Sequence, residues 1–473
     1  MRYKARLVAQ GFLQRPGFDF KETYSPVMDV ITFRYLISLV VSEKLDIRLT
    51  DVVTAYLYGE LDTDIYMKIP DGYKLPEAKS KSMYSLKLRR SLYGLKQSGR
   101  MWYNRLSEYL IKAGYKNNLI CPCVFIKKSV KGFAILAVYV DDINLIGTPE
   151  EIDETINYLK KEFEMKDLGK TKYCLGLQIE HSTNGIMIHQ SNYIEKILKR
   201  FQMDKAYPLS TPMVFRSLDI KKDPYRPKED DENVLGPEVP YLSAIGALLY
   251  LAQCTRPDIA FSVNLLARYS SEPTKRHWNG IKHIMRYLRG TTNLGLFYSN
   301  IGNNPNLVGY ADAGYLSDPH KARSQTGYVF SNSNAAISWR STKQTLVATS
   351  SNHSEILALH EASRECIWLR SLIEHIRKTC QLPSATEEST VIYEDNAACV
   401  AQIQAGYIKG DRTKHISPKF FFTHELQKDN KIEVKQIQSQ ENPADLFTKA
   451  LPKSTFQKMV YKIGMRRLHQ QTN

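Results

Sequence analysis

The sequence predicts a multidomain protein that combines α+β and α/β units. Its 473 residues suffice for two to four domains, and a hydrophobic share of 43% argues against global disorder. Strand and helix patterns alternate in the first segment. A stretch rich in proline and charge, 208–240, indicates a linker or a long exposed loop. Helical patterns then run from 241 to about 290, and a new α/β unit begins near Asn306.

Hydrophobic periodicity gives the elements of the first segment. Residues 30–44 have helical spacing, and Asp29 is placed to cap that helix. Residues 45–50 alternate with period two, which predicts a strand that delivers Asp51 at its end. The same rules predict a further helix and a hairpin, at 150–164 and 172–188.

Two adjacent carboxylates, Asp141 and Asp142, stand between the apolar runs 133–140 and 143–147. This pattern predicts a β-hairpin with both acids at its tip. Two close, unpaired carboxylates repel each other by roughly 4 kcal/mol at about 4 Å and an effective dielectric of about 20. Hard dications bind through carboxylate oxygens, so the pair predicts a Mg²⁺ site. Asp51 joins this site if its strand lies beside the hairpin; a strand-ending or capping acid is the alternative.

The composition points to a polyanionic partner. The formal charge is +16, which makes nucleic acid the first candidate and a solubilising surface charge the alternative. Seven scattered cysteines without a Cys-x-x-Cys pair indicate neither a zinc ribbon nor a disulfide framework, and they fit a reducing compartment. No signal peptide and no apolar run of about 20 residues is present, so we expect a soluble protein.

The last unit has the alternation of an α/β domain. Strand patterns surround Val308, Tyr328 and Ile337, a long helix is predicted over 352–378, and another strand over 390–393. The apolar positions of the long helix recur at helical spacing and predict a core face: Ile356, Leu359, Ala362, Leu369, Leu372, Ile373 and Ile376. The polar positions of this helix are expected to be solvated, as at Arg364 and Arg370.

Four acids of the last unit stand near predicted strand ends and helix starts: Asp312, Glu355, Asp395 and Asp445. Asn442 as N-cap and Pro443 at the first helical position mark the last of these helix starts. Such acids can converge on one edge of a sheet, where they suit a two-metal nuclease. Taken singly, each acid is as well explained as a cap or a solvated side chain.

A series of motifs resembles the reverse transcriptase of Ty1/copia-type retrotransposons. They stand in the family's order: KARLVAQG (4–11), DVVTAYL (51–57), SLYGLKQ (91–97), YVDD (139–142), MKDLG (165–169), LGLQI (175–179), TRPDI (255–259) and RYLRGT (286–291). The resemblance implies that Asp51, Asp141 and Asp142 are the catalytic metal ligands of a polymerase. It also implies a set of substrate-binding residues: Lys4, Arg6, Tyr56, Tyr93, Gly94, Gln97, Tyr139 and Lys166.

The resemblance implies particular roles for several of these residues. Tyr56 is expected beside the incoming sugar, where an aromatic ring blocks a 2′-hydroxyl. Gly94 lets the backbone approach a base pair closely. Lys4 and Arg6 would grip the triphosphate, and Lys166 would donate a proton to pyrophosphate. A core aromatic is the alternative for Tyr56, and solvated strand charges are the alternative for Lys4 and Arg6.

The last unit resembles the ribonuclease H domain attached to copia-type polymerases. The motifs are YADA (310–313), SWRSTKQ (338–344), VATSS (347–351), EDN (394–396), TKHI (413–416) and ADLFTK (444–449). By this match the catalytic metal ligands are Asp312, Glu355, Asp395 and Asp445. His415 is expected to have a structural or substrate-backbone role, with a satisfied surface histidine as the alternative. The loop 436–441 lacks the histidine that many ribonucleases H carry there.

The resemblance extends over nearly the whole chain and implies a right-hand polymerase followed by a ribonuclease H-like α/β domain. Incomplete fingers and a palm would occupy 1–205, a thumb or connection 206–300, and the ribonuclease H-like domain with a helical tail 301–473. The implied function is RNA-directed DNA polymerase with ribonuclease H activity, by two-metal phosphoryl transfer at two sites. Two Mg²⁺ ions per site are expected, with Mn²⁺ as an alternative.

The implied partners are an RNA template, a DNA primer, an RNA–DNA hybrid and dNTPs. No membrane partner is expected, and the oligomeric state is left open. The family implies cytoplasmic virus-like particles and the nucleus. Two departures from the family keep rivals open. The resemblance implies fingers strands upstream of 4–11, so we expect part of that subdomain to be missing, and Ser98-Gly99 replaces the usual Ala-Pro. The rivals are a truncated, non-catalytic nucleic-acid-binding remnant and a structural subunit of a dimeric polymerase.

Overall fold

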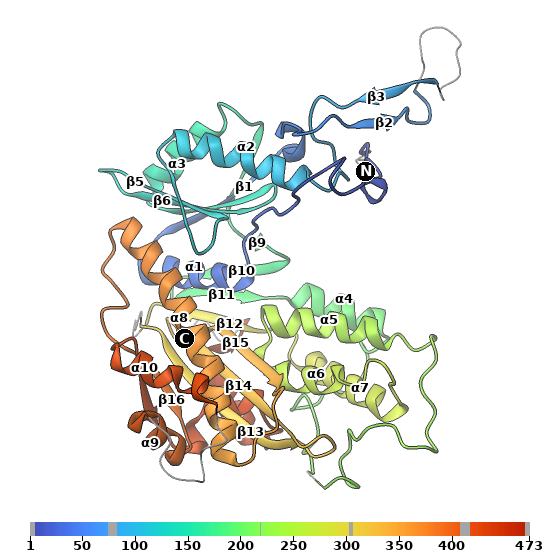
Figure 1. The fold of residues 1–473 in the computed structure, drawn as a ribbon, viewed down its shortest axis with the longest axis vertical. Helices are drawn as coiled ribbons and strands as arrows, with labels where there is room; N and C mark the ends of the chain where they lie inside the picture. Colours follow the sequence, from blue (N-terminus) through green and yellow to red (C-terminus); the bar gives the residue numbers. More distant parts are fainter. Residues whose placement is uncertain (1–4, 74–82, 218, 302–305, 407–416, 469–473) are drawn as a thin grey trace. The chain divides into compact units, whose positions relative to one another are not determined.

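The computed structural model of the chain describes residues 5–73, 83–217, 219–301, 306–406 and 417–468. The chain divides into two compact units (Figure 1). Unit 1 comprises Met1–Phe33, Leu45–Thr171 and Lys378–Leu382, and unit 2 comprises Arg34–Lys44, Lys172–Arg377 and Pro383–Asn473. Each unit mixes helices with sheets, which confirms the predicted mixed α/β multidomain class.

A six-stranded antiparallel sheet forms the centre of unit 1. Its strands are β1 (Asp46–Val52), β4 (Lys116–Asn117), β5 (Val124–Lys128), β6 (Phe133–Tyr139), β7 (Asp142–Gly147) and β8 (Met165–Lys170). They lie in the order β4-β5-β6-β7-β1-β8. The predicted hairpin of β6 and β7 is confirmed, and β1 lies directly beside β7. The sheet order therefore brings β1 to the hairpin that carries the paired acids.

Two helices, α2 (Ser98–Lys112) and α3 (Pro149–Leu159), cover one face of this sheet (Figure 1). Trp102, Leu106 and Ile156 from these helices pack in one buried cluster with Leu136 of the sheet. Helix α3 ends before the predicted limit of 164, because the chain turns there and places Phe163 in the same cluster. Unit 1 also contains two short 3₁₀ helices and a separate hairpin: η1 (Gly11–Leu13), η2 (Ala55–Tyr58), and β2 (Tyr66–Lys68) with β3 (Ser85–Lys87).

Helix α1 (Val30–Ser42) begins where the sequence predicts. The Asp29 carboxylate accepts hydrogen bonds from the backbone amides of Ile31 and Thr32, at 2.8 and 2.9 Å, and so satisfies helix donors that otherwise lack partners. From Arg34 onward α1 belongs to unit 2. There the buried Arg34 guanidinium donates to the carbonyl oxygen of Ile337 at 2.7 Å.

The first sheet of unit 2 has the order β18-β12-β11-β10-β9. Its strands are β9 (Tyr173–Cys174), β10 (Leu177–Ser182), β11 (Gly185–His189), β12 (Leu294–Ser299) and β18 (Met465–Arg467). The β10–β11 turn at 183–184 confirms the hairpin predicted there. A group of helices accompanies this sheet: α4 (Ser191–Arg200), α5 (Tyr241–Cys254), η4 (Pro257–Ile259), α6 (Ala260–Ala267) and α7 (Lys275–Gly290).

Two of the family-like motifs build the interior of this helical group. Arg256 and Asp258, from TRPDI, form a fully buried ion pair at 2.7 Å. Tyr287, from RYLRGT, donates its hydroxyl to Asp258 at 2.6 Å, and Arg256 donates to the carbonyl oxygen of Thr291 at 2.9 Å. Buried charges need such complete pairing. These motifs therefore hold the helices together.

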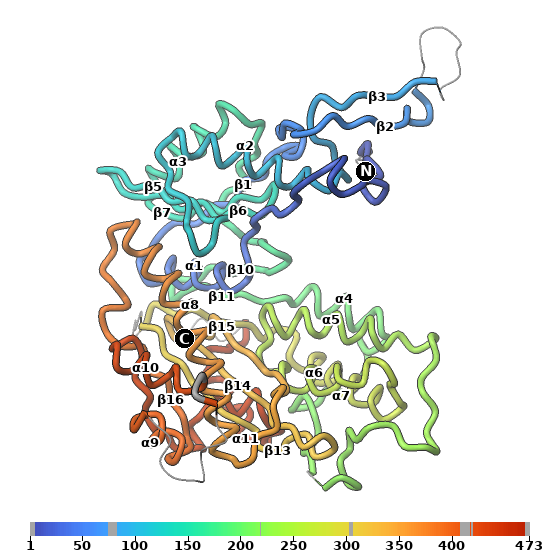
Figure 2. Tube along the Cα trace, in the orientation of Figure 1, coloured from blue at the N-terminus to red at the C-terminus, as the bar shows by residue number. Residues whose placement is uncertain are grey.

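The second sheet of unit 2 has the order β15-β14-β13-β16-β17. β13 (Val308–Asp318), β14 (Arg323–Asn332) and β15 (Ala335–Lys343) are antiparallel, whereas β16 (Thr390–Glu394) and β17 (Ile432–Gln436) join in parallel. Figure 2 follows the chain through this region. The remaining elements are α8 (Ser351–Cys380), α9 (Ala397–Ala405), η6 (Pro418–Phe421), α10 (Phe422–Lys428), η7 (Ser439–Glu441), η8 (Pro443–Phe447) and α11 (Lys453–Lys462).

Two sequence expectations need correction. The apolar face of α8 is buried as predicted, but Arg370 is not simply solvated. Its guanidinium donates to the carbonyl oxygen of Thr386 and to the hydroxyl of Thr390, both at 2.7 Å. The described residues of 208–240 contain no helix or strand, yet the stretch is not wholly exposed. Arg216 and Asp223 form a buried ion pair at 2.6 Å within this segment. The segment is held to the β13–β14 region by His320, which contacts Asp223 at 3.0 Å, and by the bond that Arg216 donates to the carbonyl oxygen of Ser317.

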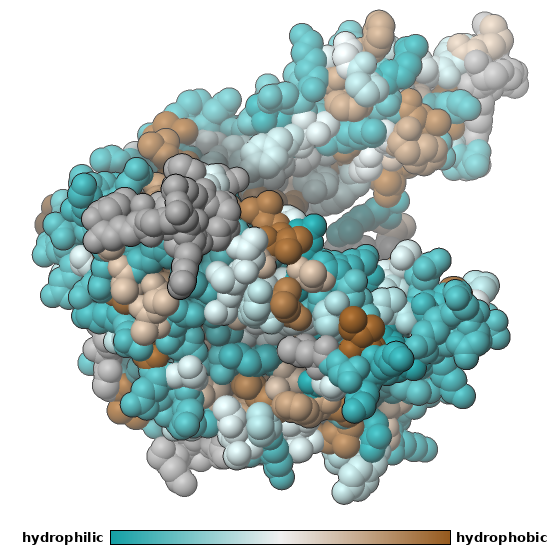
Figure 3. Space-filling model, turned by 60° about the horizontal axis from the view of Figure 1, so that its bottom comes forward, coloured by the Kyte–Doolittle hydropathy of each residue, from teal (hydrophilic) through white to brown (hydrophobic). Residues whose placement is uncertain are grey.

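The face of the molecule in Figure 3 is mainly hydrophilic, and the cysteines form no disulfide bonds. Hydrophilic side chains cover most of the face seen in Figure 3, and hydrophobic ones appear in small separate groups. All seven cysteines are free and buried. Within the part of the chain that the structure describes, no helix combines the length and the apolar character needed to cross a bilayer.

Two candidate metal centres

The first centre stands at one end of the β6–β7 hairpin in unit 1. Asp141 occupies the turn and Asp142 begins β7, while Val140 adopts a left-handed φ of 58°. Asp51 on β1 is the direct cross-strand partner of Asp142, so their Cα atoms face each other across the ladder. The amide of Val52 donates to the carbonyl oxygen of Asp141 at 2.9 Å. Sheet pairing therefore brings the three predicted acids together.

The charges of these acids interact. Burial, and then the charges of Asp141 and Asp51, raise the pKa of Asp142 to about 6. Lys166 on β8 places its Nζ atom 4.0 Å from Oδ2 of Asp51. Among the described residues, these three acids do not form a group whose ligand atoms all lie within 4.8 Å of one another. The three acids are therefore neighbours in the sheet, but their carboxylates are not gathered into one close group.

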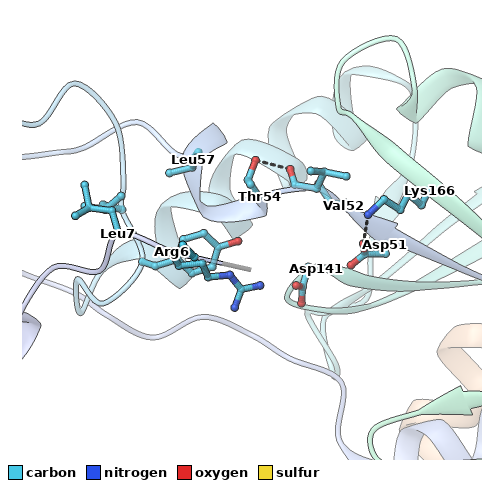
Figure 4. Close-up of a pocket in the computed structure, with 12 residues that line it drawn as sticks. Arg6, Leu7, Asp51, Val52, Thr54, Leu57, Asp141 and Lys166 are labelled. Atoms are coloured by element: carbon cyan, nitrogen blue, oxygen red, sulfur yellow. Dashed lines mark hydrogen bonds and ion pairs between the residues drawn. The ribbon is translucent and has the colours of Figure 1, made fainter. Parts of the chain in front are cut away.

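A pocket with a volume of about 640 Å³ adjoins this centre (Figure 4). Its lining includes Asp51, Asp141, Lys166, Arg6 and Tyr93. Figure 4 shows Arg6 extending from the opposite wall toward the side where the two aspartates lie. The pocket therefore combines acids that can bind cations with basic groups that can bind an anion.

An aromatic pair forms part of the wall. The Arg6 guanidinium lies over the Tyr93 ring, 5.0 Å from its centroid, and the rings of Tyr93 and Tyr56 are also 5.0 Å apart. Burial, and then the charge of Asp141, raises the pKa of Tyr56. Tyr56 lies behind Tyr93 and packs against the core, so both interpretations of Tyr56 keep support. Tyr139, at the end of β6, is 39% exposed.

Gly94 and Gln97 make contacts within the protein. A Cβ atom on Gly94 would lie 2.1 Å from the carbonyl oxygen of Ala9, and the Gly94 φ of +94° also favours glycine. The Gln97 side chain is buried, donates to the carbonyl oxygen of Asp19 at 2.8 Å, and accepts from Gln14 at 3.0 Å. Gly94 thus packs against the KARLVAQG segment, whereas Gln97 bonds residues that follow that motif. The expected contacts with nucleotide or template stay predictions. Lys4 lies outside the described residues.

The second centre lies in unit 2, where parallel pairing aligns two of its acids. Tyr310 of β13 is the partner of Tyr393 of β16. Asp312 on β13 and Asp395, which directly follows the end of β16, each come two residues later, so they stand at equivalent positions along the two strands. Glu355, on the first turns of α8, completes a group of three whose ligand atoms all lie within 4.8 Å. Three of the four acids whose convergence the sequence predicts therefore lie together in this centre.

The fourth acid reaches the cluster through its helix cap. The Asn442 side chain accepts from the amide of Ala444 at 3.1 Å and donates to the carbonyl oxygen of Ala311 at 2.8 Å. This bond ties the start of η8 to the residue beside Asp312. Asp445 lies in η8, and Lys449 binds its carboxylate at 2.7 Å. The predicted cap is confirmed, although the element it opens is a short 3₁₀ helix.

Three contributors to this centre were missed from the sequence. Lys449 also lies 3.5 Å from Oδ1 of Asp312, and the Thr448 hydroxyl donates to Oδ2 of the same carboxylate. Glu394 is fully buried beside the cluster. The i, i+4 spacing of Asp445 and Lys449 was a usable signal for their pairing. The sequence contains no comparable signal for Glu394, because only the folded structure shows that this side chain, next to Asp395, is buried.

Desolvation and mutual repulsion dominate the electrostatics of this centre. Burial, and then the charges of neighbouring acids, raise the pKa of Glu355 and Glu394 well above their usual range. The same causes raise the pKa of Asp445 to about 7 and also raise that of Asp395. Charge repulsion of this kind is relieved by a bound cation.

The residues present fit a divalent metal ion. Among the described residues, the buried Oε2 atom of Glu355 has no hydrogen-bond partner. An unpartnered carboxylate oxygen inside a cluster of carboxylates is a suitable ligand for Mg²⁺ or Mn²⁺. Asp312, Glu355 and Asp395 would hold one ion, with Asp445 beside them. His415 lies outside the described residues.

Comparison with known proteins shows the family. Residues 1–215 match the family model for "Reverse transcriptase (RNA-dependent DNA polymerase)". The chain is 30% identical to the "Putative transposon Ty5-1 protein YCL074W" of Saccharomyces cerevisiae, over 67% of this chain and 99% of that protein. It is 37% identical to the "Retrovirus-related Pol polyprotein from transposon TNT 1-94" of Nicotiana tabacum, over 98% of this chain. The chain belongs to the copia-type retrotransposon Pol family.

Two further matches complete this comparison. This Pol chain is 34% identical, over 99% of its length, to the "Retrovirus-related Pol polyprotein from transposon RE1" of Arabidopsis thaliana. It spans about a third of these plant polyproteins, 34% of the TNT 1-94 protein and 31% of the RE1 protein. A solved LC11-RNase H1 in complex with an RNA/DNA hybrid covers 30% of this chain, at 17% identity and a TM-score of 0.23.

Proposed function

We propose that this chain is an RNA-directed DNA polymerase that also carries ribonuclease H activity, with one reaction in each compact unit. The observation that carries the proposal is the presence of two separate carboxylate centres. Asp51, Asp141 and Asp142 belong to unit 1, and the cluster around Asp312 and Glu355 belongs to unit 2. Membership of the copia-type Pol family supports the assignment of the two reactions.

Metal ions bound by these acids would activate the attacking oxygen and neutralise charge on the leaving group. In unit 1 the ligands would be Asp51, Asp141 and Asp142. Arg6, held over Tyr93 at the pocket wall, would bind the triphosphate of a dNTP. Lys166, 4.0 Å from Asp51, would donate a proton to the departing pyrophosphate. Tyr56 behind Tyr93 would limit the space for a 2′-hydroxyl.

In unit 2 the ligands would be Asp312, Glu355, Asp395 and Asp445, and the substrate would be the RNA strand of an RNA–DNA hybrid. Thr448 and the Asn442 cap orient this centre through Asp312 and the carbonyl group of Ala311. Fully buried Glu394 adds a carboxyl group whose raised pKa favours the neutral form, and this limits the negative charge next to Glu355.

The wider organisation follows from the family. We infer fingers and palm over 1–205, a thumb or connection over 206–300, and a ribonuclease H-like domain over 301–473. The partners would be an RNA template, a DNA primer, the hybrid and dNTPs, and the places of action would be cytoplasmic particles and the nucleus. The net charge of +16 favours binding to these polyanions.

Paired substitutions test the proposal. Asp141→Asn should reduce primer extension on an RNA template by at least about 10³-fold, because it removes a ligand that acts in the transition state, and should leave hybrid cleavage intact. Asp395→Asn should reduce hybrid cleavage by a similar factor and should leave primer extension intact. Both activities are measured on one end-labelled hybrid with Mg²⁺ and dNTPs, and EDTA should abolish both.

Asp153→Asn is a matched control, because Asp153 lies in unit 1 and makes an ion pair with Arg48 remote from the turn. If the unmodified chain binds the hybrid but neither extends nor cleaves it, the chain is a non-catalytic binding remnant. If one substitution abolishes both reactions, the two-centre assignment is wrong.

A further inference from the structure

Lys449 occupies an unusual position in the second centre. Its Nζ atom lies 2.7 Å from Oδ1 of Asp445 and 3.5 Å from Oδ1 of Asp312. Among the described residues, Lys449 is the one basic side chain that makes an ion pair with any acid of this cluster. The ammonium group therefore stands between two carboxylates that otherwise repel each other at close range.

Asp312 is shared between two sides of the centre. On one side it joins Glu355 and Asp395, with all three ligand atoms within 4.8 Å. On the other side it faces Asp445 across the Lys449 ammonium. The Thr448 hydroxyl donates to Oδ2 of Asp312, so this carboxylate has little freedom to turn. A metal ion can enter the first side without disturbing Lys449, whereas an ion between Asp312 and Asp445 cannot.

We propose that Lys449 is a built-in cation that occupies the place of a second metal ion between Asp312 and Asp445. The second ion binds only after the Lys449 side chain has moved out. Lys449 is a long, flexible side chain that is 42% exposed, so it can turn toward solvent without rearranging the core. This inference rests on the proposed function of the same centre.

The consequence is an asymmetry between the two ions. The first ion meets the Glu355 oxygen that lacks a partner and binds a ready set of acids. The second ion must compete with an attached ammonium group, whose effective concentration is high. The centre therefore keeps its acids stable without metal and delays assembly of the two-ion state. Lys449 acts through Asp312 and Asp445 and is a positioning residue.

The test counts bound ions in the full chain. Asp141→Asn and Asp142→Asn are introduced first, so that Mn²⁺ reports unit 2 alone. Electron paramagnetic resonance then follows a Mn²⁺ titration. The parent should bind one ion, with a second at a higher concentration. Lys449→Met should shift the second event to about tenfold lower Mn²⁺, a change within the range known for residues that support metal ligands. Lys449→Arg keeps the charge and should resemble the parent.

Lys435→Met is the matched control. Lys435 pairs with Glu433 on the exposed face of β17, so its loss should leave both binding events unchanged. A second readout is thermal: Lys449→Met should lower the melting temperature in EDTA by about 5 °C, and Mn²⁺ should restore it. An unchanged second event in a folded Lys449→Met protein overturns the inference. A parent that binds no Mn²⁺ in unit 2 overturns the proposed nuclease function instead.

Discussion

Asp142 differs from an exposed aspartate because its neighbours are also acids. Its direct cross-strand partner is Asp51, and Asp141 precedes it in the turn. Partial burial and these charges raise its pKa from an ordinary 3.8 to about 6. The ionised form is therefore disfavoured in the folded chain relative to the unfolded chain. Protonation of Asp142 stabilises the fold, and ionisation of Asp142 weakens it.

The raised pKa of Asp142 determines the direction in which stability changes with pH. In EDTA, the melting temperature of the wild type minus that of Asp142→Asn should rise as the pH falls from 7.5 to 4.5. The reason is that the folded wild type takes up its proton near pH 6, before the unfolded chain does. Differential scanning calorimetry of both proteins measures this difference. Saturating Mg²⁺ should flatten the curve, and a flat curve in EDTA would contradict the raised pKa.

Some residues of the two centres could be predicted from the sequence, and others could not. The seven acids that we propose as metal ligands could be named from motif and position, since strand ends and caps are local features. Gln97 could not be placed, because its burial depends on Asp19 and Gln14, which lie far from it in the sequence. Lys449 was overlooked for a similar reason: its contact with Asp312 spans 137 positions, and only the folded sheet closes that distance.

The β6–β7 turn is the element that presents the first centre. Val140 has a positive φ, which costs a β-branched residue conformational energy. The indole Nε1 of Trp102 donates to the carbonyl oxygen of Val140 at 2.8 Å and holds the turn from α2. Trp102 is itself buried in the cluster between α2 and the sheet. The position of the acids thus depends on a helix that carries none of them.

Trp102→Phe tests this dependence. The substitution keeps an aromatic ring but removes the donor, so the turn loses a restraint of about 1 kcal/mol. Primer extension should fall by about tenfold or more, since small displacements of catalytic groups reduce rates steeply. Hybrid cleavage should not change.

Tyr103→Phe provides the control for this prediction. It lies on the same helix and loses a hydroxyl bond to the carbonyl oxygen of Pro122 at 2.8 Å, away from the turn. If Trp102→Phe and Tyr103→Phe reduced primer extension equally, the hydrogen bond from Trp102 to Val140 would not be the cause of the loss. Gel assays of extension and cleavage on the same preparation give both values.

At the scale of the whole molecule, basic side chains outnumber acidic ones, which predicts a basic surface in addition to the two acidic centres. Lysines and arginines number 65 against 49 acids, although seven of those acids belong to the two candidate centres. The excess of positive charge therefore lies elsewhere on the chain. A polyanion attracted by that surface would release counterions when it binds.

Affinity for an RNA–DNA hybrid should accordingly fall steeply with salt. With about six phosphate contacts, the association constant should drop by about 10³-fold between about 50 and 200 mM monovalent salt. Fluorescence anisotropy with a labelled hybrid, with EDTA present to prevent cleavage, measures the slope. Binding that does not depend on salt would exclude the basic surface as the main contact.

The sequence by itself determined the family, the mixed α/β class, the β6–β7 hairpin and the caps at Asp29 and Asn442, and it named the acids that we propose as metal ligands. These features are local, because periodicity, capping and motif order are written within short stretches of chain. Tertiary structure alone decided that the 208–240 stretch is held to unit 2 through Ser317 and His320, that α3 ends early, and that Lys449 enters the second centre. These features depend on contacts between distant segments, where burial and pairing outweigh local preference.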